Sequence, residues 1–315
     1  MNFESITSDV TPLDPKDDGR HVLRDEPLCR ESLVFTVDVP DEKIAGFVYP
    51  RVGSDGKAAG IVTVFGEGVP GGSITEVYHD IPVPASMDFG AWNAGGVEVR
   101  LTRPLRTAEV KYTSRRLGYE FVFEASHPAY SYDSHTDGCP RYFADNRFEQ
   151  SGRVRGTLTI DGRLIELDTF GQRDHSWGTR NWGVNYHYKW FHATAPNAAV
   201  HFFKMEYLGR SLVRGYVFKK GHMSQVQSAE VLDFTLDDDM FHKDITARVY
   251  DAAGRATSVA GRGFAHTTLP VDANNVLHET PMTIEIDGES GLGWCEMHWD
   301  TRYLEHMRKF THIRR

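Results

Sequence analysis

The chain has 315 residues, of which 40% are hydrophobic and 25% charged, a composition typical of globular proteins with room for two domains. A formal net charge of −9 argues against binding to a phosphate backbone, so we expect no nucleic-acid partner. Three widely spaced cysteines without a CxxC pair fit a reducing compartment. The polar N-terminus has no apolar signal region, and no apolar run reaches membrane-spanning length. We expect a cytoplasmic protein without a membrane span.

Alternation of polar and apolar residues dominates the chain and predicts β-strands. β-Branched and aromatic residues fill these segments, and Gly, Asp, Asn or Pro residues close them. The clearest expected strands are residues 32–39, 58–65, 96–102, 119–124 and 211–218. Tight turns are expected at Ser54-Asp55-Gly56, at Asp161-Gly162 and at Ala253-Gly254; the Asp-Gly pair is typical of type I′ hairpins. Short helical patterns occur at residues 87–92 and 302–309.

A long polar stretch at residues 126–146 interrupts the strand rhythm. Long ordered loops often act as lids or as arms that reach a partner, so a homodimer stays open. Many short strands without intervening helices predict an antiparallel sandwich or barrel. We expect an all-β fold of two consecutive halves, residues 1–168 and 169–315, with few short helices.

Residues 170–192 combine three of the six tryptophans with three histidines, two arginines, a lysine and an aspartate. Indole rings exclude water and strengthen the electrostatics of polar groups between them, so this mixture is typical of a polar-tipped cavity. Asp174 and His175 suit proton transfer near neutral pH. Arg173 could keep a neighbouring carboxylate ionised. We expect the functional site to include this segment.

Asp174 and His175 are neighbours in the chain, and neighbours on a regular strand point to opposite faces. They can share one site only if the backbone bends, and the flanking Gly171 and Gly178 make a bend or bulge plausible. The alternative interpretation is a buried Asp–His–Arg network that joins two domains.

Two further strands combine aromatic with titratable side chains. Tyr188 and His192 share one face of the strand expected at residues 186–192. Near the C-terminus the same combination recurs on one face, at Trp294, Glu296 and His298. Both faces suit the wall of a cavity. The C-terminal strand fits a core strand with an exposed polar face equally well.

Lys204 and Glu206 share one face of the strand expected at residues 200–207. This face is either exposed to solvent or places a paired Lys and Glu inside a barrel. Composition favours solvent exposure, because Lys and Glu are seldom buried.

Several common enzyme classes lack their motifs in this chain. There is no GxSxG sequence of a hydrolase and no GxGxxG sequence of a dinucleotide site. HExxH and paired-cysteine patterns are also absent from the sequence. A three-histidine metal site remains an alternative, with ligands drawn from His175, His187, His192 or His201.

The segment Gly171-Gln-Arg-Asp174-His175-Ser-Trp177-Gly178, following the Asp161-Gly162 hairpin, resembles a motif of the carotenoid 1,2-hydratase and AttH-like family, to which kievitone hydratase is related. The RDHSWGxR form is closest to uncharacterised bacterial members. The resemblance covers residues 150–210, and elsewhere only the pattern of strands is shared. It implies two lipocalin-like barrels and cofactor-free proton chemistry on an apolar isoprenoid-like substrate.

In those hydratases a His-x-Trp pair and a later aromatic-x-acid pair are implicated. His175 and Trp177 match the first pair. Lys204-Met-Glu206 is the nearest match to the second, with a lysine where the family has an aromatic residue. Protonation of an alkene needs a carboxylic acid kept protonated by an apolar wall, which Asp174 or Glu206 could supply. The neighbouring Arg173 would lower the pKa of Asp174, which favours Glu206 as the acid.

We therefore expect a hydratase, dehydratase, isomerase or cyclase that acts on a hydrophobic terpenoid- or polyketide-like molecule without a cofactor or metal. The expected catalytic residues are Asp174, His175 and Glu206. The expected substrate-binding residues are Arg173, Trp177, Tyr188, His192, Lys204, Trp294, Glu296 and His298. The alternatives are a non-catalytic carrier of the same kind of ligand and a metal-dependent β-barrel enzyme.

Overall fold

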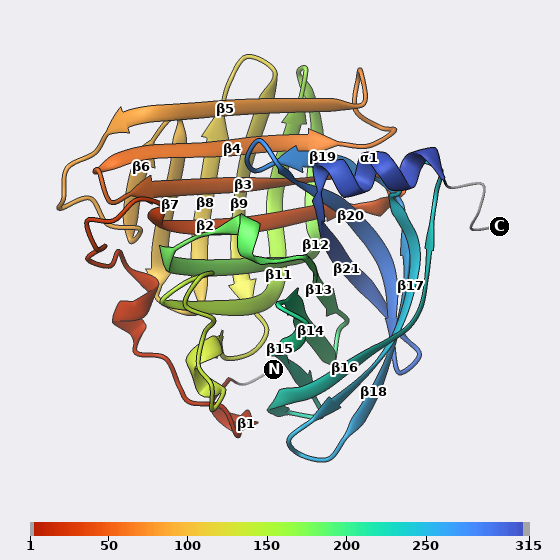
Figure 1. Ribbon diagram of the computed structural model, residues 1–315. Helices are drawn as coiled ribbons and strands as arrows, with labels where there is room; N and C mark the ends of the chain where they lie inside the picture. Colours follow the sequence, from red (N-terminus) through yellow and green to blue (C-terminus); the bar gives the residue numbers. More distant parts are fainter. Residues whose placement is uncertain (1–2, 311–315) are drawn as a thin grey trace. The chain divides into compact units, whose positions relative to one another are not determined.

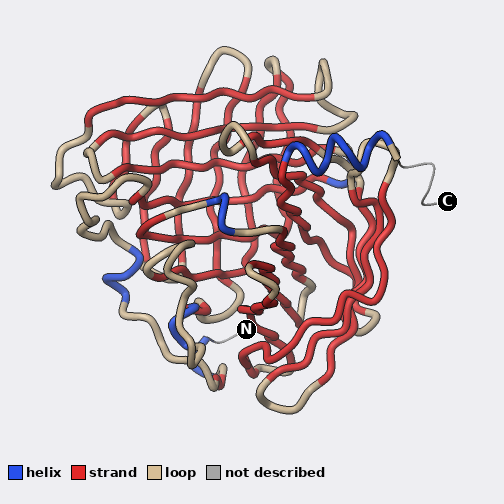
Figure 2. Tube along the Cα trace, in the orientation of Figure 1, coloured by secondary structure: helices blue, strands red, loops and turns tan. Residues whose placement is uncertain are grey.

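The computed structural model describes residues 3–310, which are almost entirely β-strand (Figures 1 and 2). The chain divides into two compact units, Met1–Arg180 and Asn181–Arg315. Each unit contains one barrel-like antiparallel sheet, so the expected all-β fold of two consecutive lipocalin-like halves is confirmed. Residue 168 lies within strand β12 (Arg163–Thr179). No helix within residues 3–310 is long and apolar enough to cross a membrane.

The first unit is a nearly closed barrel with strand order β5-β4-β3-β2-β12-β11-β9-β8-β7-β6. Figure 1 shows β2 to β5 passing in front of β7 to β9. Besides β12, its strands are β2 (Cys29–Val39), β3 (Ile44–Gly53), β4 (Lys57–Phe65), β5 (Ser73–Pro82), β6 (Ala91–Ala94), β7 (Val97–Arg103), β8 (Thr107–Thr113), β9 (Leu117–Ala125), β10 (Tyr130–Ser131) and β11 (Asn146–Ile160). The two-residue strand β1 (Thr7–Ser8) is not part of this sheet. Four 3-10 turns complete the unit: η1 (Phe3–Ser5), η2 (Pro15–Asp18), η3 (Pro40–Glu42) and η4 (Tyr132–Ser134).

Alternate side chains along these strands form the core of the first barrel. Leu33 and Phe35 on β2 are completely buried in it. Each buried apolar side chain of this size contributes roughly 1.5–3 kcal/mol through the hydrophobic effect. The two edge strands approach each other where Tyr78 of β5 lies against Gly95. Gly95 has φ +62°, and a Cβ there would lie 2.3 Å from the Tyr78 ring, so only glycine fits.

The second unit is a closed barrel with strand order β16-β15-β14-β13-β21-β20-β18-β17, completed by pairing of β16 with β17. Its elements are η5 (Trp182–Val184), β13 (His187–Thr194), β14 (Ala198–Tyr207), β15 (Arg210–Lys219), β16 (His222–Leu236), β17 (His242–Asp251), β18 (Ala256–Gly263), β19 (Thr267–Pro270), β20 (Asn275–Ile286), β21 (Glu289–Asp300) and α1 (Thr301–Lys309). Asp300 caps α1 by accepting hydrogen bonds from the backbone N–H groups of Arg302 and Tyr303. Phe191, Phe202 and Cys295 are among the completely buried core residues.

The expected strands and turns are confirmed. At the Asp161-Gly162 turn, φ is +48° and +84°, as a type I′ hairpin requires. The helix expected at residues 302–309 is α1. The helix expected at residues 87–92 is wrong, because Ala91–Ala94 pairs with β7 and Trp92 is buried in the barrel core. Within residues 126–146, β10 pairs with β11.

The backbone around Gly178 leaves no room for a side chain, so a Gly178→Ala substitution should lower the free energy of unfolding. Its φ is +114°, and a Cβ there would lie 2.4 Å from the Asp145 backbone nitrogen, which donates to the Trp177 carbonyl. Gly162 also has positive φ but has open space around the Cβ position. We expect Gly178→Ala to destabilise the first unit by about 1–3 kcal/mol more than Gly162→Ala, because only Gly178→Ala adds an overpacking cost. Urea unfolding of the two variants tests this expectation, and equal midpoints would contradict it.

Candidate functional site

Strand β12, which carries the Asp174-His175 motif, places these two neighbouring residues on opposite faces of the sheet. Its pairing with β11 and β2 passes through Asp174 and His175 without a register shift. The strand therefore has no bulge between Gly171 and Gly178, where the sequence made one plausible; these glycines instead allow other backbone segments to approach closely. His175 lies opposite Leu33 and faces the barrel interior, whereas Asp174 faces the outside. Asp174 and His175 thus belong to different groups of side chains.

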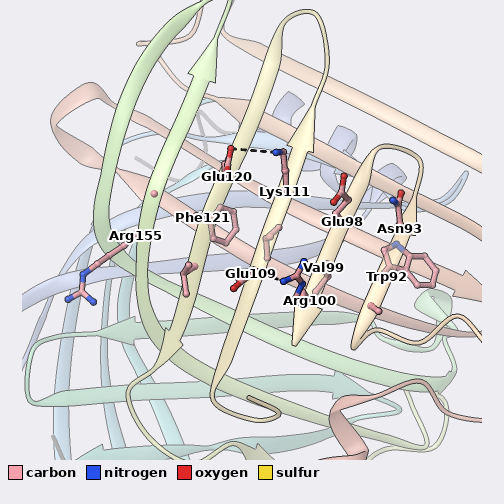
Figure 3. A pocket seen from close by; sticks show the side chains of 14 residues that line it. Trp92, Asn93, Glu98, Val99, Arg100, Glu109, Lys111, Glu120, Phe121 and Arg155 are labelled. Carbon is pink, nitrogen blue, oxygen red and sulfur yellow. Dashed lines mark ion pairs between the residues drawn. The ribbon is translucent and has the colours of Figure 1, made fainter. Parts of the chain in front are cut away.

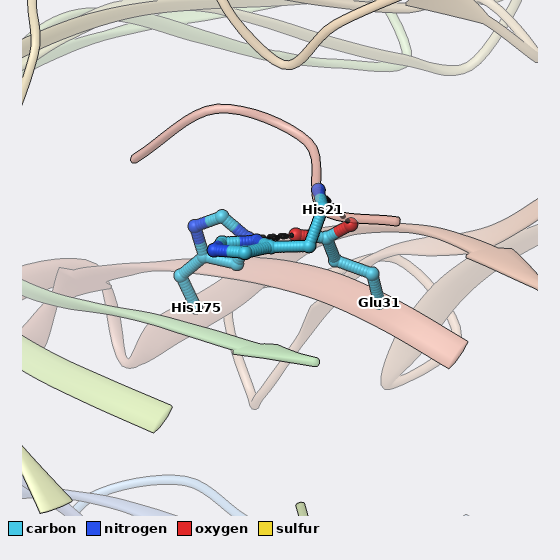
Figure 4. A group of neighbouring side chains, drawn as sticks. All are labelled: His21, Glu31 and His175. Atoms are coloured by element: carbon cyan, nitrogen blue, oxygen red, sulfur yellow. Dashed lines mark hydrogen bonds and ion pairs between the residues drawn. The ribbon is translucent and has the colours of Figure 1, made fainter. Parts of the chain in front are cut away.

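Inside the first barrel, His175 meets two residues from the N-terminal part of the chain (Figure 4). Glu31, on β2, places Oε1 2.8 Å from His175 Nε2 and 2.6 Å from His21 Nδ1. His175 and Glu31 are completely buried, while His21 lies on a loop and its side chain is 21% exposed. The Trp177 indole stacks on the His21 ring at a centroid distance of 3.7 Å. Burial raises the pKa of Glu31, but the hydrogen bonds with His175 and His21 outweigh it and lower that pKa on balance.

A buried ion pair lies beside this cluster. Arg173 Nη1 and Nη2 donate to the two carboxylate oxygens of Asp18 at 2.9 and 3.0 Å. Arg173 Nε donates to Gln150 Oε1 at 2.9 Å. The Arg173 and Asp18 side chains are each only 1% exposed. This planar two-point contact fixes η2, which carries Asp18, against β12.

Asp174 belongs to a second buried network on the outer face of the same sheet. Arg147 Nη2 donates to Asp174 Oδ2 at 2.7 Å, and Arg147 Nε donates to Glu149 Oε1 at 2.6 Å. Glu149 also accepts hydrogen bonds from Tyr132 Oη and Gln172 Nε2. Burial raises the pKa of Tyr132, and the Glu149 carboxylate raises it further. A fully bonded network of this kind rigidifies the sheet.

In the second unit, two glutamates face each other across neighbouring strands. Glu279 of β20 lies directly opposite Glu296 of β21 in the register. Glu279 is only 3% exposed, whereas Glu296 is partly exposed. Burial and the neighbouring Glu296 carboxylate raise the pKa of Glu279 well above its usual range. A raised pKa favours the protonated form of Glu279, whose carboxyl group can then donate a hydrogen bond to Glu296.

Aromatic side chains surround the glutamate pair. Trp294 Nε1 donates to Glu279 Oε2 at 2.7 Å, and Tyr188 Oη donates to Glu296 Oε1 at 2.5 Å. Trp190 lies directly opposite Glu296 on the neighbouring strand. The Tyr188 ring contacts Phe203, stacks on His298 and lies near Trp182. Tyr188, Trp294, Glu296 and His298, all singled out from the sequence, therefore gather in one place.

His192 is buried near this group, and burial lowers its pKa well below the usual range. Burial also lowers the pKa of His298 to about 4, and its Nε2 donates to Asn275 Oδ1. Both histidines are therefore neutral near pH 7.

Lys204 and Glu206 lie on the core-facing side of β14, so their expected exposure to solvent is wrong. Lys204 pairs in register with Lys189 and Glu206 with His187, on the face that carries Phe202. Both side chains are partly buried. Long charged side chains can pack their stems against a core while their heads stay hydrated, a property that composition does not reveal.

A pocket of about 630 Å³ lies over the outer face of the sheet formed by β6 to β9 and β11 (Figure 3). Ion pairs join Arg100 to Glu109 and Lys111 to Glu120, each at 3.7 Å. These side chains are well exposed, as expected for a solvated charged face. The pocket includes none of the site residues described above.

Sequence reasoning missed Asp18, His21, Glu31 and Glu279. Glu31 stands directly before an expected strand, and Asp18 and His21 lie in a polar N-terminal segment without a recognisable pattern. Glu279 lies in an unassigned alternating segment. Only the strand register could reveal that it faces Glu296.

Two consecutive antiparallel barrels with buried polar clusters define the class of this protein as a double lipocalin-like β protein. The chain belongs to the family described as domain of unknown function DUF7064, whose model matches residues 14–301. No curated protein matches it by sequence.

Solved structures share the fold. An AttH-like protein from Nitrosomonas europaea is 14% identical, with 91% of this chain and 97% of that chain covered and a TM-score of 0.64. CghA with Sch210972 is 12% identical, with coverage of 87% and 89% and a TM-score of 0.59. A further structure of CghA gives 12% identity, coverage of 86% and 88%, and a TM-score of 0.55. At these identities the likeness concerns the fold alone.

Proposed function

We propose that this protein is an acid–base enzyme that protonates a small apolar molecule, with Glu296 as the proton donor and Glu279 as its partner. The two facing glutamates carry this proposal, together with the pKa of Glu279, which burial and the neighbouring Glu296 raise. A carboxylic acid that keeps its proton at neutral pH is what protonation of an alkene or a tertiary alcohol requires. Glu296 is the partly exposed member, so it is the one placed to contact a substrate.

The surroundings of the pair suit the cation that such a protonation creates. Indole and phenol faces stabilise positive charge through their π electrons. Tyr188 and Trp294 hydrogen-bond the two glutamates directly, and Trp190 faces Glu296 across the strand pair. These contacts fix the carboxyl groups in one orientation, which reduces the reorganisation needed during proton transfer.

The acid role therefore moves from Asp174 and Glu206 to Glu296. Asp174 is ion-paired with Arg147, a contact that fits it for a positioning role. Glu206 faces the core of the second unit beside His187. The substrate class of the proposal is a terpenoid- or polyketide-like molecule, and the reaction is hydration, dehydration, isomerisation or cyclisation. The motif resemblance and the fold shared with CghA, whose structure contains Sch210972, support this choice.

The proposal is tested by following deuterium from the solvent into the product. The full chain is incubated in D2O with a panel of polyenes, terpenoid alcohols and linear polyketides, and products are analysed by mass spectrometry. Where the reaction begins with protonation of an alkene, we expect deuterium at a carbon of the converted compound, because the carboxyl proton exchanges with solvent before transfer. Dehydration of an alcohol is recognised instead by a product that has lost water. A parallel incubation in H2¹⁸O separates hydration, which incorporates ¹⁸O, from isomerisation and cyclisation.

The Glu279→Gln/Glu296→Gln double variant is the control and should give no deuterated product. Ligand binding without isotope incorporation would favour the carrier alternative. Incorporation that is unchanged in the double variant would exclude the glutamate pair as the acid.

A further inference from the structure

Three potential metal ligands converge inside the first barrel, remote in sequence from the glutamate pair. His21, Glu31 and His175 come from a loop, from β2 and from β12, and one potential ligand atom of each lies within 4.8 Å of the other two (Figure 4). Each contributes one atom of a type that transition metals bind. Two imidazoles and one carboxylate also form the protein ligand set of several catalytic zinc sites.

The short contacts in this cluster require positive charge between the atoms. The Glu31 oxygen lies 2.6 Å from His21 Nδ1 and 2.8 Å from His175 Nε2. A carboxylate oxygen and a ring nitrogen carrying a lone pair repel each other at such distances unless a proton or a metal ion lies between them. Either each ring turns an N–H toward Glu31, or one cation serves all three donors.

The second nitrogen of His175 favours the metal ion. Nδ1 is completely buried and, among the described residues, has no hydrogen-bond partner. If the proton sits on Nε2 and faces Glu31, Nδ1 keeps a buried lone pair with no donor, which is costly. If the proton sits on Nδ1, it faces Asp18 Oδ1 at 4.0 Å, and Nε2 becomes free to bind a metal. At 4.0 Å this is an electrostatic contact, longer than the hydrogen bond that a carboxylate usually forms with a metal-binding histidine in zinc sites.

The surrounding residues hold the donors in place. Arg173 fixes Asp18 through two hydrogen bonds. Trp177 stacks on His21 with ring planes 9° apart, and Phe89 and Phe148 contact the His175 ring edge-on. Tetrahedral zinc needs donor separations of about 3.3 Å, given metal–ligand distances near 2.0–2.2 Å. Both ring nitrogens lie closer than this to Glu31 Oε1, so metal binding requires small shifts at His21, on its partly exposed loop, and between Glu31 and His175.

We propose that His21, Glu31 and His175 bind one divalent transition-metal ion, with zinc the best match to two imidazoles and a carboxylate. Because His21 is partly exposed, the fourth coordination position is accessible to water or to a small anionic ligand. This proposal does not depend on the glutamate pair of the second unit.

Metal titration of the full chain tests the proposal. The protein is stripped with a chelator and titrated with Zn²⁺ by calorimetry, with Fe²⁺ and Mn²⁺ in parallel. Co²⁺ then serves as a spectroscopic probe of coordination geometry. We expect one Zn²⁺ per chain, a tetrahedral Co²⁺ spectrum, and at least a tenfold loss of affinity in His21→Ala and in Glu31→Gln.

The controls distinguish this site from others. His79→Ala removes an exposed histidine that also lies beside a carboxylate, that of Asp80, and should bind zinc like the parent. Glu279→Gln should also bind zinc like the parent, so failure of the proposed acid chemistry would leave this result unaffected. Binding that survives both His21→Ala and Glu31→Gln would overturn the proposal. If none of Zn²⁺, Fe²⁺ and Mn²⁺ binds stoichiometrically, the proposal is also overturned. The three side chains would then form a hydrogen-bonded cluster without a metal ion.

Discussion

Glu279→Gln is expected to lower turnover by about 10²–10⁴-fold, the usual contribution of a general acid. Glutamine has nearly the same shape and can accept the hydrogen bond from Trp294 while its amide donates to Glu296. The variant therefore keeps the geometry of the pair but loses the carboxyl proton of Glu279. Turnover is measured on the substrate identified by isotope incorporation, alongside ligand affinity, which should change little.

The two glutamates act as one unit in this proposal, so their substitutions should not be additive. Glu296→Gln should also lower turnover strongly, and the double variant should be little worse than either single variant. Glu285→Gln on the same strand is the matched control, because Glu285 is exposed and far along β20 from the pair. Equal turnover of Glu279→Gln and Glu285→Gln would contradict the assignment.

The pH dependence of stability provides an independent measure of the same proton. The folded-state pKa of Glu279 lies well above its unfolded value. Its contribution to stability is fully present below the unfolded pKa and is lost as the pH rises toward the folded pKa, because the unfolded chain releases the proton first. A glutamine side chain carries no such proton. Glu279→Gln should therefore gain stability relative to the parent as the pH rises from about 4.3, the ordinary glutamate pKa. Urea unfolding of both proteins at a series of pH values above the ordinary glutamate pKa measures the difference between their free energies of unfolding. A difference that does not change with pH would contradict the raised pKa of Glu279.

Arg173→Met is expected to destabilise the first unit by about 3–5 kcal/mol, the usual cost of breaking a buried ion pair from one side. The substitution leaves the Asp18 carboxylate, 1% exposed, without its two charged hydrogen bonds. The backbone N–H of Leu105 is then its remaining donor among the contacts described. Urea unfolding with hydrogen exchange in β12 measures the effect and locates it.

Two control variants distinguish the effect of leaving a buried charge unpaired from the effect of removing an arginine side chain. Arg116→Met breaks an equally well-aligned pair with Asp161 whose side chains are 39% and 36% exposed. Solvent screening should limit that cost to about 1 kcal/mol or less. Adding Asp18→Asn to Arg173→Met removes the stranded charge and should recover part of the stability. A similar cost for Arg173→Met and Arg116→Met would contradict a buried charge effect.

Local alternation predicted much of this fold. Period-two segments such as residues 32–39 and 211–218 are strands because β-branched and aromatic residues pack well on a half-buried pleated surface. The Asp161-Gly162 turn followed from its residue types alone, since both positions need positive φ. The same alternation showed that Trp294, Glu296 and His298 share a face, because side chains two apart on a strand always do.

The sites themselves depend on strand order and register, which local alternation does not contain. In the sequence Glu279 is one more glutamate, yet β20–β21 pairing sets it opposite Glu296, and burial and that neighbour raise its pKa. Asp18, His21 and Glu31 reach His175 because the N-terminal segment and β2 pack against β12. The unbroken register of β12 also separates Asp174 from His175.

Strands, turns and the faces that side chains share along each strand thus follow from the amino-acid order, since they depend on neighbours in the chain. The packing of segments that are distant in the chain decides which charged groups come into contact and which of them are buried away from water. Local sequence patterns do not contain this information. Coulombic and hydrogen-bond energies depend on distance and burial, and both are set by contacts between residues far apart in the chain.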